Sequence, residues 1–193
     1  ELILPPAEQS VSDVYRVGER IKVYVLSVEK TNKFPKILIS RKNEGLLKKL
    51  FEIEIPEITS GIIEIKSVAR EAGSRAKVAV YSAVPNIDTI GACIGQKGAR
   101  IKNIVDELNG ERIDIVEWKP VVEEFVSAVL SPAVVSNVTI LEDGTARVLV
   151  EPSQLSLAIG KNGQNARLAA RLTGMRVDIK VIDNETLKEE ENE

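Results

Sequence analysis

The chain has 193 residues, of which 44% are hydrophobic and 28% are charged, a composition typical of an ordinary globular protein. It contains no histidine and one cysteine, Cys93, so an intrachain disulfide, a zinc site built on histidine and Cys–His nucleophilic catalysis are excluded. We therefore interpret Cys93 as a small buried residue, and we expect no cofactor and no metal. Carboxylate chemistry stays open at this point, although no paired carboxylates stand out. No apolar run approaches the roughly 18 residues of a membrane span and no signal peptide opens the chain, which predicts a cytoplasmic protein without membrane contact.

The net charge of −3 is unevenly distributed along the chain. The last eleven residues, 183–193, hold six acids and one lysine, so residues 1–182 carry a net charge of +2. We interpret residues 183–193 as a solvated acidic tail. The distribution of charge, rather than its sum, therefore leaves a nucleic-acid partner open.

The first 42 residues predict two strands, at 20–29 and 36–40. Two strands cannot bury a core by themselves, so residues 1–42 are interpreted as part of a β-domain. The chain opens with Glu1 rather than Met, which suggests a fragment or a processed product.

From residue 43 onward the sequence contains two copies of one unit. Gly95-Gln96-Lys97-Gly98 is matched 65 residues later by Gly160-Lys161-Asn162-Gly163. Gly110 is matched by Gly174, and both stand where a helix is expected to end. Each copy predicts the order helix, strand, strand, helix, helix, strand, an α+β arrangement. The expected elements of the first copy are a helix around 46–51, strands at 61–70 and 76–84, helices at 89–94 and 98–108, and a strand at 112–118; those of the second copy are a helix around 122–130, strands at 134–141 and 146–150, helices at 153–159 and 163–172, and a strand at 176–182.

The repeated Gly-x-x-Gly sequence is the candidate site. Two glycines leave a loop surface without Cβ atoms, so another backbone can approach it closely. The helix that follows points free N–H groups and a partial positive charge at that approach, which favours a phosphate. Residues 95–102 and 160–171 also carry three basic side chains each and no acid. The candidate RNA-binding residues are Gly95, Gln96, Lys97, Gly98, Arg100 and Lys102 in the first copy, and Gly160, Lys161, Asn162, Gly163, Gln164 and Arg167 in the second.

Other residues near the loops have two interpretations each. Ile94, Ile101 and Ile159 flank the loops and serve either as core or as an apolar floor for bases. Asp114 and Asp178 occupy equivalent places in the closing strands, where a structural role is favoured over hydrogen bonding to a base. The chain has only three Phe, three Tyr and one Trp, so stacking on aromatic side chains cannot be the main mode of binding.

The helix–loop–helix with Gly-x-x-Gly resembles a KH domain, whose loop clamps the backbone of about four nucleotides, and the order of elements resembles the type II arrangement. Residues 90–100 and 154–169 are similar to the first and second KH domains of the NusA family of bacterial transcription elongation and termination factors. Residues 1–42, with Leu4-Pro5, Tyr15-Arg16-Val17-Gly18 and Ile39-Ser40-Arg41, resemble the second half of the S1 domain of that family, an OB-type β-barrel. The residue at Thr89 and the run Lys119-Pro120-Val121 depart from the family pattern.

The resemblance implies four parts: a partial S1 domain at 1–42, KH domains at 43–119 and 120–182, and the acidic tail at 183–193. It also implies a non-enzymatic protein that binds single-stranded RNA, the nascent transcript, and that modulates pausing, termination and antitermination. RNA polymerase would be contacted through the full-length factor, together with other transcription factors of the elongation complex, and the chain is expected to be a monomer. Two alternatives are an S1/KH subunit of an RNA-degrading complex and a KH fold used only for protein contacts.

Overall fold

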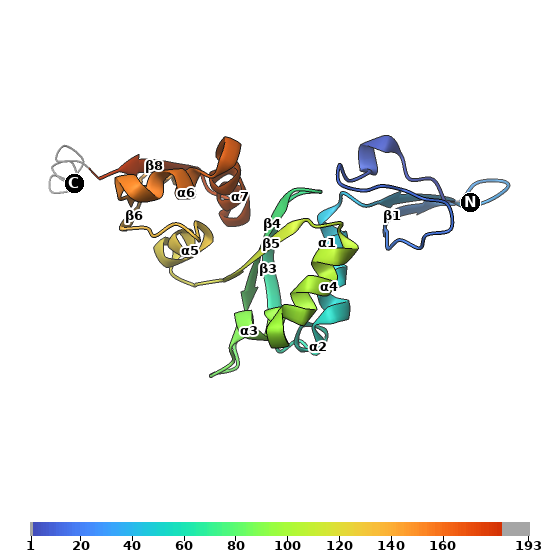
Figure 1. The fold of residues 1–193 in the computed structure, drawn as a ribbon, viewed down its shortest axis with the longest axis horizontal. Helices are drawn as coiled ribbons and strands as arrows, with labels where there is room; N and C mark the ends of the chain where they lie inside the picture. Colours follow the sequence, from blue (N-terminus) through green and yellow to red (C-terminus); the bar gives the residue numbers. More distant parts are fainter. Residues whose placement is uncertain (1, 183–193) are drawn as a thin grey trace. The chain divides into compact units, whose positions relative to one another are not determined.

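The computed structural model describes residues 2–182, and the chain divides into two compact units between Ile115 and Val116. Figure 1 follows the elements in chain order from blue to red. The acidic tail expected at 183–193 lies outside the described residues.

The first unit opens with a small antiparallel sheet. Strand β1 (Tyr24–Glu29) pairs with β2 (Lys36–Ser40), and the register shifts between Val25 and Ser27. The two strands do not close into a barrel, and the assignment to an S1 domain stays a prediction. Several apolar side chains of this part are more than 60% exposed, as expected of two strands that cannot bury a core: Ile3, Val11, Val14, Val17, Val28 and Phe34.

A buried charge cluster fixes residues 2–42 to the rest of the unit. The Arg41 guanidinium, 1% exposed, donates to the two carboxylate oxygens of Asp13 at 2.6 and 2.9 Å and to the Glu107 carboxylate at 3.1 Å. Asn109 also donates to Asp13, at 2.7 Å, and Lys22 donates to Glu107. Burial opposes ionisation of both acids, but the hydrogen bonds from these donors outweigh it and lower the pKa of Asp13 and of Glu107.

The predicted element order of the first copy is confirmed. Asn43 caps the first helix by accepting a hydrogen bond from the Gly45 N–H at 2.7 Å. The strands form one sheet in the order β3-β4-β5 (Figure 1). One short helix, α2, was not predicted. The elements are α1 (Glu44–Glu54), α2 (Pro56–Thr59), β3 (Glu64–Glu71), β4 (Arg75–Tyr81), α3 (Thr89–Ile94), α4 (Ala99–Glu107) and β5 (Arg112–Glu117).

The core of this copy lies between the helices and one face of the sheet. Helix α1 contributes Leu46, Leu47, Leu50 and Phe51, each at most 2% exposed. They pack with residues on β3, β4, α3 and α4 and with the residue directly after α4, namely Val68, Ala76, Val78, Val80, Cys93, Ile104 and Leu108. Burial of this apolar area is the main term that holds the loop-bearing helices α3 and α4 against the sheet.

A buried ion pair joins the ends of three segments in the first copy. Arg70, at the end of β3, donates from Nε and Nη2 to both carboxylate oxygens of Glu111 at 2.7 and 2.9 Å, and the two side chains are 1% and 0% exposed. Glu111 also accepts from the N–H of Gly73 at 2.8 Å, and Arg70 donates to the carbonyl of Asn43 at 2.9 Å. The pair therefore ties the start of β5 to the β3–β4 hairpin and to the cap of α1.

The second copy repeats the same order in the second unit. Its strands lie in the order β6-β7-β8, β6 pairs antiparallel with β7, and β7 pairs parallel with β8. Its buried apolar residues lie mainly on α5, β7, α6 and α7, whereas β6, unlike β3 of the first copy, contributes none. The elements are α5 (Val122–Val129), β6 (Asn137–Ile140), β7 (Ala146–Val150), α6 (Leu155–Ile159), α7 (Gln164–Thr173) and β8 (Val177–Val181). None of the helices within residues 2–182 has the length and apolar character that crossing a membrane requires.

Candidate nucleic-acid interface

The two Gly-x-x-Gly loops have the same backbone conformation. Gly95 ends α3 with φ 76° and ψ 173°, and Gly160 ends α6 with φ 75° and ψ 170°. The third residue of each loop, Lys97 or Asn162, adopts a left-handed conformation with φ 52° and ψ 26° or φ 54° and ψ 29°. The fourth residues, Gly98 and Gly163, are also left-handed. Two sequences that share only their glycines thus form one loop geometry.

The two glycines of each loop have different roles. A Cβ at Gly95 would lie 2.7 Å from the Arg100 side chain, and one at Gly160 would lie 2.8 Å from the backbone nitrogen of Asn165. The first glycine therefore permits close packing inside the protein. A Cβ at Gly98 would meet nothing within 4 Å, and one at Gly163 would lie at an ordinary contact distance of 3.6 Å from Arg167 Nη1. The second glycine therefore faces largely open space, where the absence of a side chain lets a ligand backbone approach.

Each loop leads directly into the N-terminus of the longer helix. The N-cap residue of α4 and of α7 is a glycine, which has no side chain to cap the helix. The N–H groups of the first helical turn therefore remain oriented toward the loop, with the partial positive charge of the helix end. In the first copy a shallow depression lies at this point, lined by Gly91, Ala92, Gly95, Gln96, Ala99 and Arg100.

Most of the predicted side chains are exposed on this surface. Gln96, Lys97 and Lys102 are exposed around the first loop, and Lys161 and Asn162 are exposed around the second. The three lysines carry their charge on long flexible stems that can reach a bound phosphate, whereas Gln96 and Asn162 can offer only neutral hydrogen-bond donors. Contact between these residues and RNA stays a prediction.

Two of the predicted basic residues already have hydrogen-bond partners within the protein. Arg167 donates from Nη1 to the carbonyl of Asn162 at 2.8 Å, and Gln164 is half-buried beside it. Arg100 donates from Nη1 to the carbonyl of Ala92 at 2.6 Å and to the Glu57 carboxylate at 2.9 Å.

Sequence reasoning missed Asn165, which is 0% exposed at the start of α7. Its Nδ2 atom donates to the carbonyls of Leu130, Ala158 and Leu157 at 3.0, 3.1 and 3.3 Å. Its Oδ1 atom is buried and has no hydrogen-bond partner among the described residues. A polar amide in the first turn of a predicted helix, at the place where the first copy has Arg100, was the available signal.

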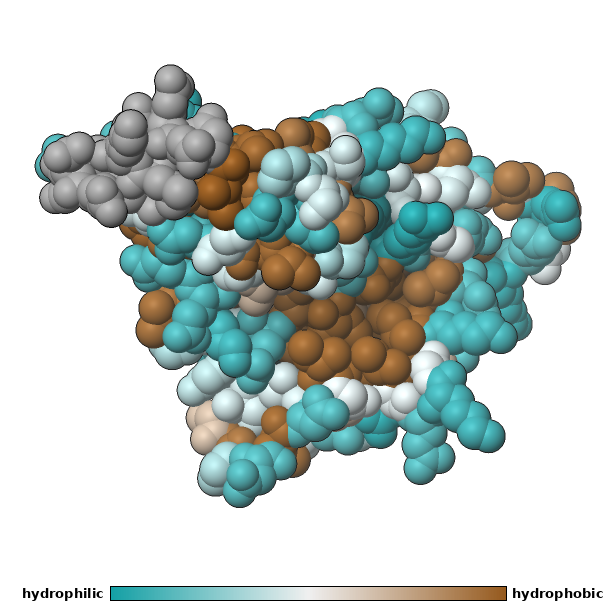
Figure 2. Space-filling view, turned by 60° about the vertical axis from the view of Figure 1, so that its left-hand side comes forward, coloured by the Kyte–Doolittle hydropathy of each residue, from teal (hydrophilic) through white to brown (hydrophobic). Residues whose placement is uncertain are grey.

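The flanking residues show both of the roles considered for them. Ile94 and Ile159 are 37% and 38% exposed beside the loops, whereas Ile101 packs against the core of the first copy. Asp114 pairs with Arg75 at 2.6 Å and with Lys77 at 3.1 Å, which is the structural role. Asp178 is exposed in β8. Figure 2 shows that hydrophobic residues, coloured brown, reach the surface on the face of the molecule that it draws.

The single cysteine is part of the core. Cys93 is 0% exposed, and burial raises the pKa of its thiol to about 12. A thiol with that pKa remains protonated near neutral pH and is a poor nucleophile. No group of three or more cysteine, aspartate or glutamate side chains within residues 2–182 is placed to hold a metal ion.

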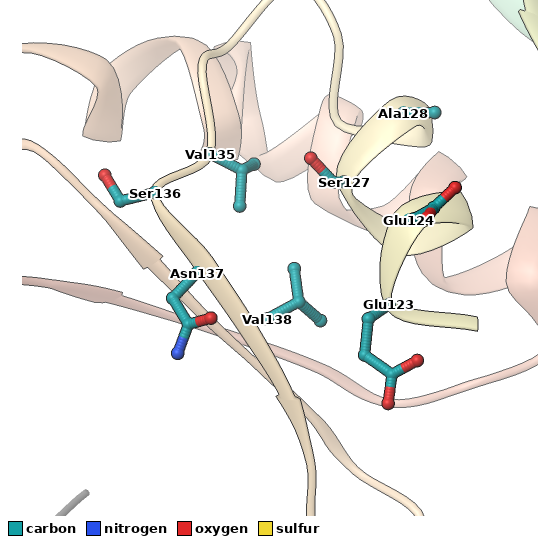
Figure 3. Close-up of a pocket in the computed structure, with 8 residues that line it drawn as sticks. All are labelled: Glu123, Glu124, Ser127, Ala128, Val135, Ser136, Asn137 and Val138. Atoms are coloured by element: carbon teal, nitrogen blue, oxygen red, sulfur yellow. The ribbon is translucent and has the colours of Figure 1, made fainter. Parts of the chain in front are cut away.

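A shallow groove between α5 and β6 has the opposite electrostatic character to the loops (Figure 3). Val135 and Val138 supply apolar side chains to it, and Glu123 and Glu124 line its helix side. Two carboxylates beside the groove repel phosphate. RNA is therefore expected at the loops and not in this groove.

Comparisons with known families agree with the element order and the two loops. A model described as the NusA-like first KH domain matches residues 41–118, and one described as the NusA-like second KH domain matches residues 122–187. The chain belongs to the NusA family. Its α-β-β-α-α-β repeats are the two tandem KH domains of that family, and these matches favour the NusA assignment over a subunit of an RNA-degrading complex.

Relatives with curated names support the same assignment. The transcription termination/antitermination proteins NusA of Halalkalibacterium halodurans and Bacillus subtilis are each 54% identical over 181 residues, which is 93% of this chain and 47% or 49% of those proteins. The NusA of Thermus thermophilus is 47% identical over 190 residues, 98% of this chain and 49% of that protein. The chain therefore spans about half the length of the curated relatives it matches.

A solved structure titled "Crystal structure of APE1850" has a similar fold. It superposes with a TM-score of 0.52 at 22% sequence identity and covers 68% of this chain and 94% of its own. At that identity the likeness supports the fold alone.

Proposed function

We propose that this chain binds single-stranded RNA through its two Gly-x-x-Gly loops, as the RNA-binding part of a NusA-family transcription factor that modulates pausing, termination and antitermination. The observation that carries the proposal is the pair of loops with one backbone conformation, each opening onto an uncapped helix N-terminus with exposed lysine beside it. A KH loop of this kind clamps the nucleic-acid backbone, and the bases are then recognised along their edges. The chain acts by binding and not by catalysis.

The ligand is a nascent transcript, and the partial S1 domain at 1–42 precedes KH domains at 43–119 and 120–182. Contacts with RNA polymerase and with other factors of the elongation complex belong to the longer protein. Residues 2–42 are held to the first KH domain by the Arg41 cluster, which supports their acting as one body with it.

The direct test replaces the two middle residues of each loop with aspartate. Asp is tolerated at the left-handed positions of Lys97 and Asn162, so the fold should survive. Each double change, at Gln96 and Lys97 or at Lys161 and Asn162, places two carboxylates beside the bound phosphate. The affinity for a fluorescent single-stranded RNA should fall about tenfold or more for each loop, or about 1.4 kcal/mol.

A control for the change in net charge lies on α1, where Lys48 and Lys49 are exposed. The pair Lys48→Glu and Lys49→Glu changes the net charge by more than either loop variant and should leave RNA affinity within a few-fold of the parent. Circular dichroism checks that all variants fold. A folded variant with aspartates in both loops that binds RNA like the parent would remove the loops from the mechanism and favour a KH fold used for protein contacts.

A further inference from the structure

The two loops have the same geometry although the residue that follows each loop differs in chemistry. Arg100 and Asn165 occupy equivalent positions, 65 residues apart, two residues after the second glycine. One is a long cation and the other a short neutral amide. A side chain that binds phosphate in one repeat would not be replaced by a fully buried amide in the other. The equivalence therefore points to a role that both side chains can fill.

That shared role is to bind the end of the short helix. Arg100 donates to the carbonyl of Ala92 in α3, and Asn165 donates to the carbonyls of Leu157 and Ala158 in α6. Ala92 and Leu157 are equivalent residues of the two repeats. Each side chain therefore satisfies carbonyls in the last turn of the helix that leads into the loop, while its own backbone begins the helix that leaves it.

Each side chain also reaches one further element. Arg100 contacts Glu57 of α2 at 2.9 Å, and Asn165 contacts the carbonyl of Leu130, directly after α5, at 3.0 Å. The second repeat has no helix equivalent to α2, so a backbone carbonyl stands where the first has a carboxylate. In both repeats the loop is thus tied to the segment before the first strand.

We infer that Arg100 and Asn165 are equivalent positioning residues, which hold the two glycine loops in their phosphate-binding conformation and do not themselves contact the RNA. The first glycine of each loop packs against this residue, because a Cβ at Gly95 or Gly160 would strike it. The inference rests on the proposed function of the loops. It reassigns Arg100, whose positive charge otherwise suggests a phosphate contact.

Salt dependence separates a phosphate contact from a positioning role. Each cation that pairs with a single-stranded phosphate contributes about 0.7 to the slope of log K against log salt, and a neutral positioning group contributes none. The experiment measures the affinity of the full chain for a fluorescent single-stranded RNA, long enough to reach both loops, over a series of salt concentrations. The variants are Lys97→Gln, Arg100→Ala and Asn165→Ala, with Asn103→Ala, an exposed asparagine on α4, as the matched control.

Lys97→Gln should weaken binding and reduce the slope by about 0.7. Arg100→Ala and Asn165→Ala should each weaken binding by about tenfold with the slope unchanged, since they disturb the loop and remove no phosphate contact. Arg100→Lys, which keeps a donor for the Ala92 carbonyl, should recover most of the affinity. Asn103→Ala should bind like the parent. Circular dichroism and urea unfolding confirm that the variants compared are folded, and should Asn165→Ala fail to fold, Arg100→Ala decides the question.

A slope reduced by Arg100→Ala as much as by Lys97→Gln would overturn the inference and make Arg100 a phosphate contact. A folded Asn165→Ala variant with parental affinity would overturn it for the second repeat. Neither result would affect the proposed function, which fails instead if the parent chain does not bind single-stranded RNA or if Lys97→Gln and the loop aspartates leave its affinity unchanged.

Discussion

The substitution Glu111→Gln isolates the charge of one buried ion pair. Glu111 and Arg70 are 0% and 1% exposed and share two hydrogen bonds of 2.7 and 2.9 Å. Glutamine keeps the shape of the side chain and one acceptor for the Gly73 N–H, but it leaves the Arg70 charge buried without its counter-ion. Breaking a buried pair in this way costs about 3–5 kcal/mol of unfolding free energy.

The lower end of that range applies here, because Arg70 retains its hydrogen bond to the Asn43 carbonyl. A loss of about 3 kcal/mol corresponds to a fall of at least about 12 °C in Tm for a domain of this size. Urea unfolding measures the change, and hydrogen exchange of the intact chain shows whether it is confined to the first KH domain. Glu52→Gln is the control, because the Lys49–Glu52 pair on α1 is 60% and 41% exposed and should contribute less than about 0.5 kcal/mol.

A second variant distinguishes the ion pair from simple loss of packing. Arg70→Met combined with Glu111→Leu removes both charges and fills similar volume, and it should be more stable than Glu111→Gln alone, because an apolar pair leaves no unpaired charge. An unfolding free energy for Glu111→Gln within about 1 kcal/mol of the parent would show that water or rearrangement compensates the Arg70 charge, and the reasoning from burial would be wrong.

Three further outcomes follow from the structure. The pKa values of Asp13 and Glu107 are lowered, so their ionised forms stabilise the attachment of residues 2–42 above the ordinary carboxylate pKa of about 4. This stability is lost as the pH falls through the lowered values. Hydrogen exchange of the β1 and β2 amides, corrected for intrinsic rates, should therefore accelerate at acid pH before exchange of the β7 amides does. Gly160→Ala, at φ 75° and against the Asn165 backbone, should destabilise the chain by more than about 1 kcal/mol in urea and by more than Gly144→Ala, where φ is 78° and no atom lies within 4 Å. Cys93 should resist alkylation in the native state at neutral pH and react after unfolding, as followed by mass spectrometry.

The elements of both KH domains could be predicted because their signals are local. Helix α3, β2 and β7 have the predicted bounds, and most other ends lie within three residues of the prediction. Hydrophobic periodicity sets each element, and the glycines at 110 and 174 set the helix ends. Because the sequence contains two copies of the same unit, each weak local pattern occurs twice, which strengthens the prediction of the element. The missed helix α2 has only four residues, Pro56–Thr59, too few for a periodic pattern.

The side-chain network behind the loops could not be predicted, because its partners are far apart in sequence. Glu57 and Arg100 are 43 residues apart, Leu130 and Asn165 are 35 apart, and Arg41 and Glu107 are 66 apart. A basic window without acids indicates where phosphate can bind, but it does not distinguish a cation that faces solvent from one that a carboxylate from another element already holds. Arg100 is the residue for which this distinction changes the interpretation.

The two loops share a backbone geometry but differ in their side chains, so backbone and side chains have separate roles in each KH domain. The backbone conformation is the same in both loops, and it is fixed by the glycines and by Arg100 or Asn165, so the N–H groups of α4 and α7 present the same geometry to a phosphate. The residues at the tip differ, Gln96-Lys97 against Lys161-Asn162, and they supply charge rather than shape. Because recognition of the nucleic-acid backbone depends on the shared geometry, the two domains can bind the same kind of strand while their exposed side chains set different strengths.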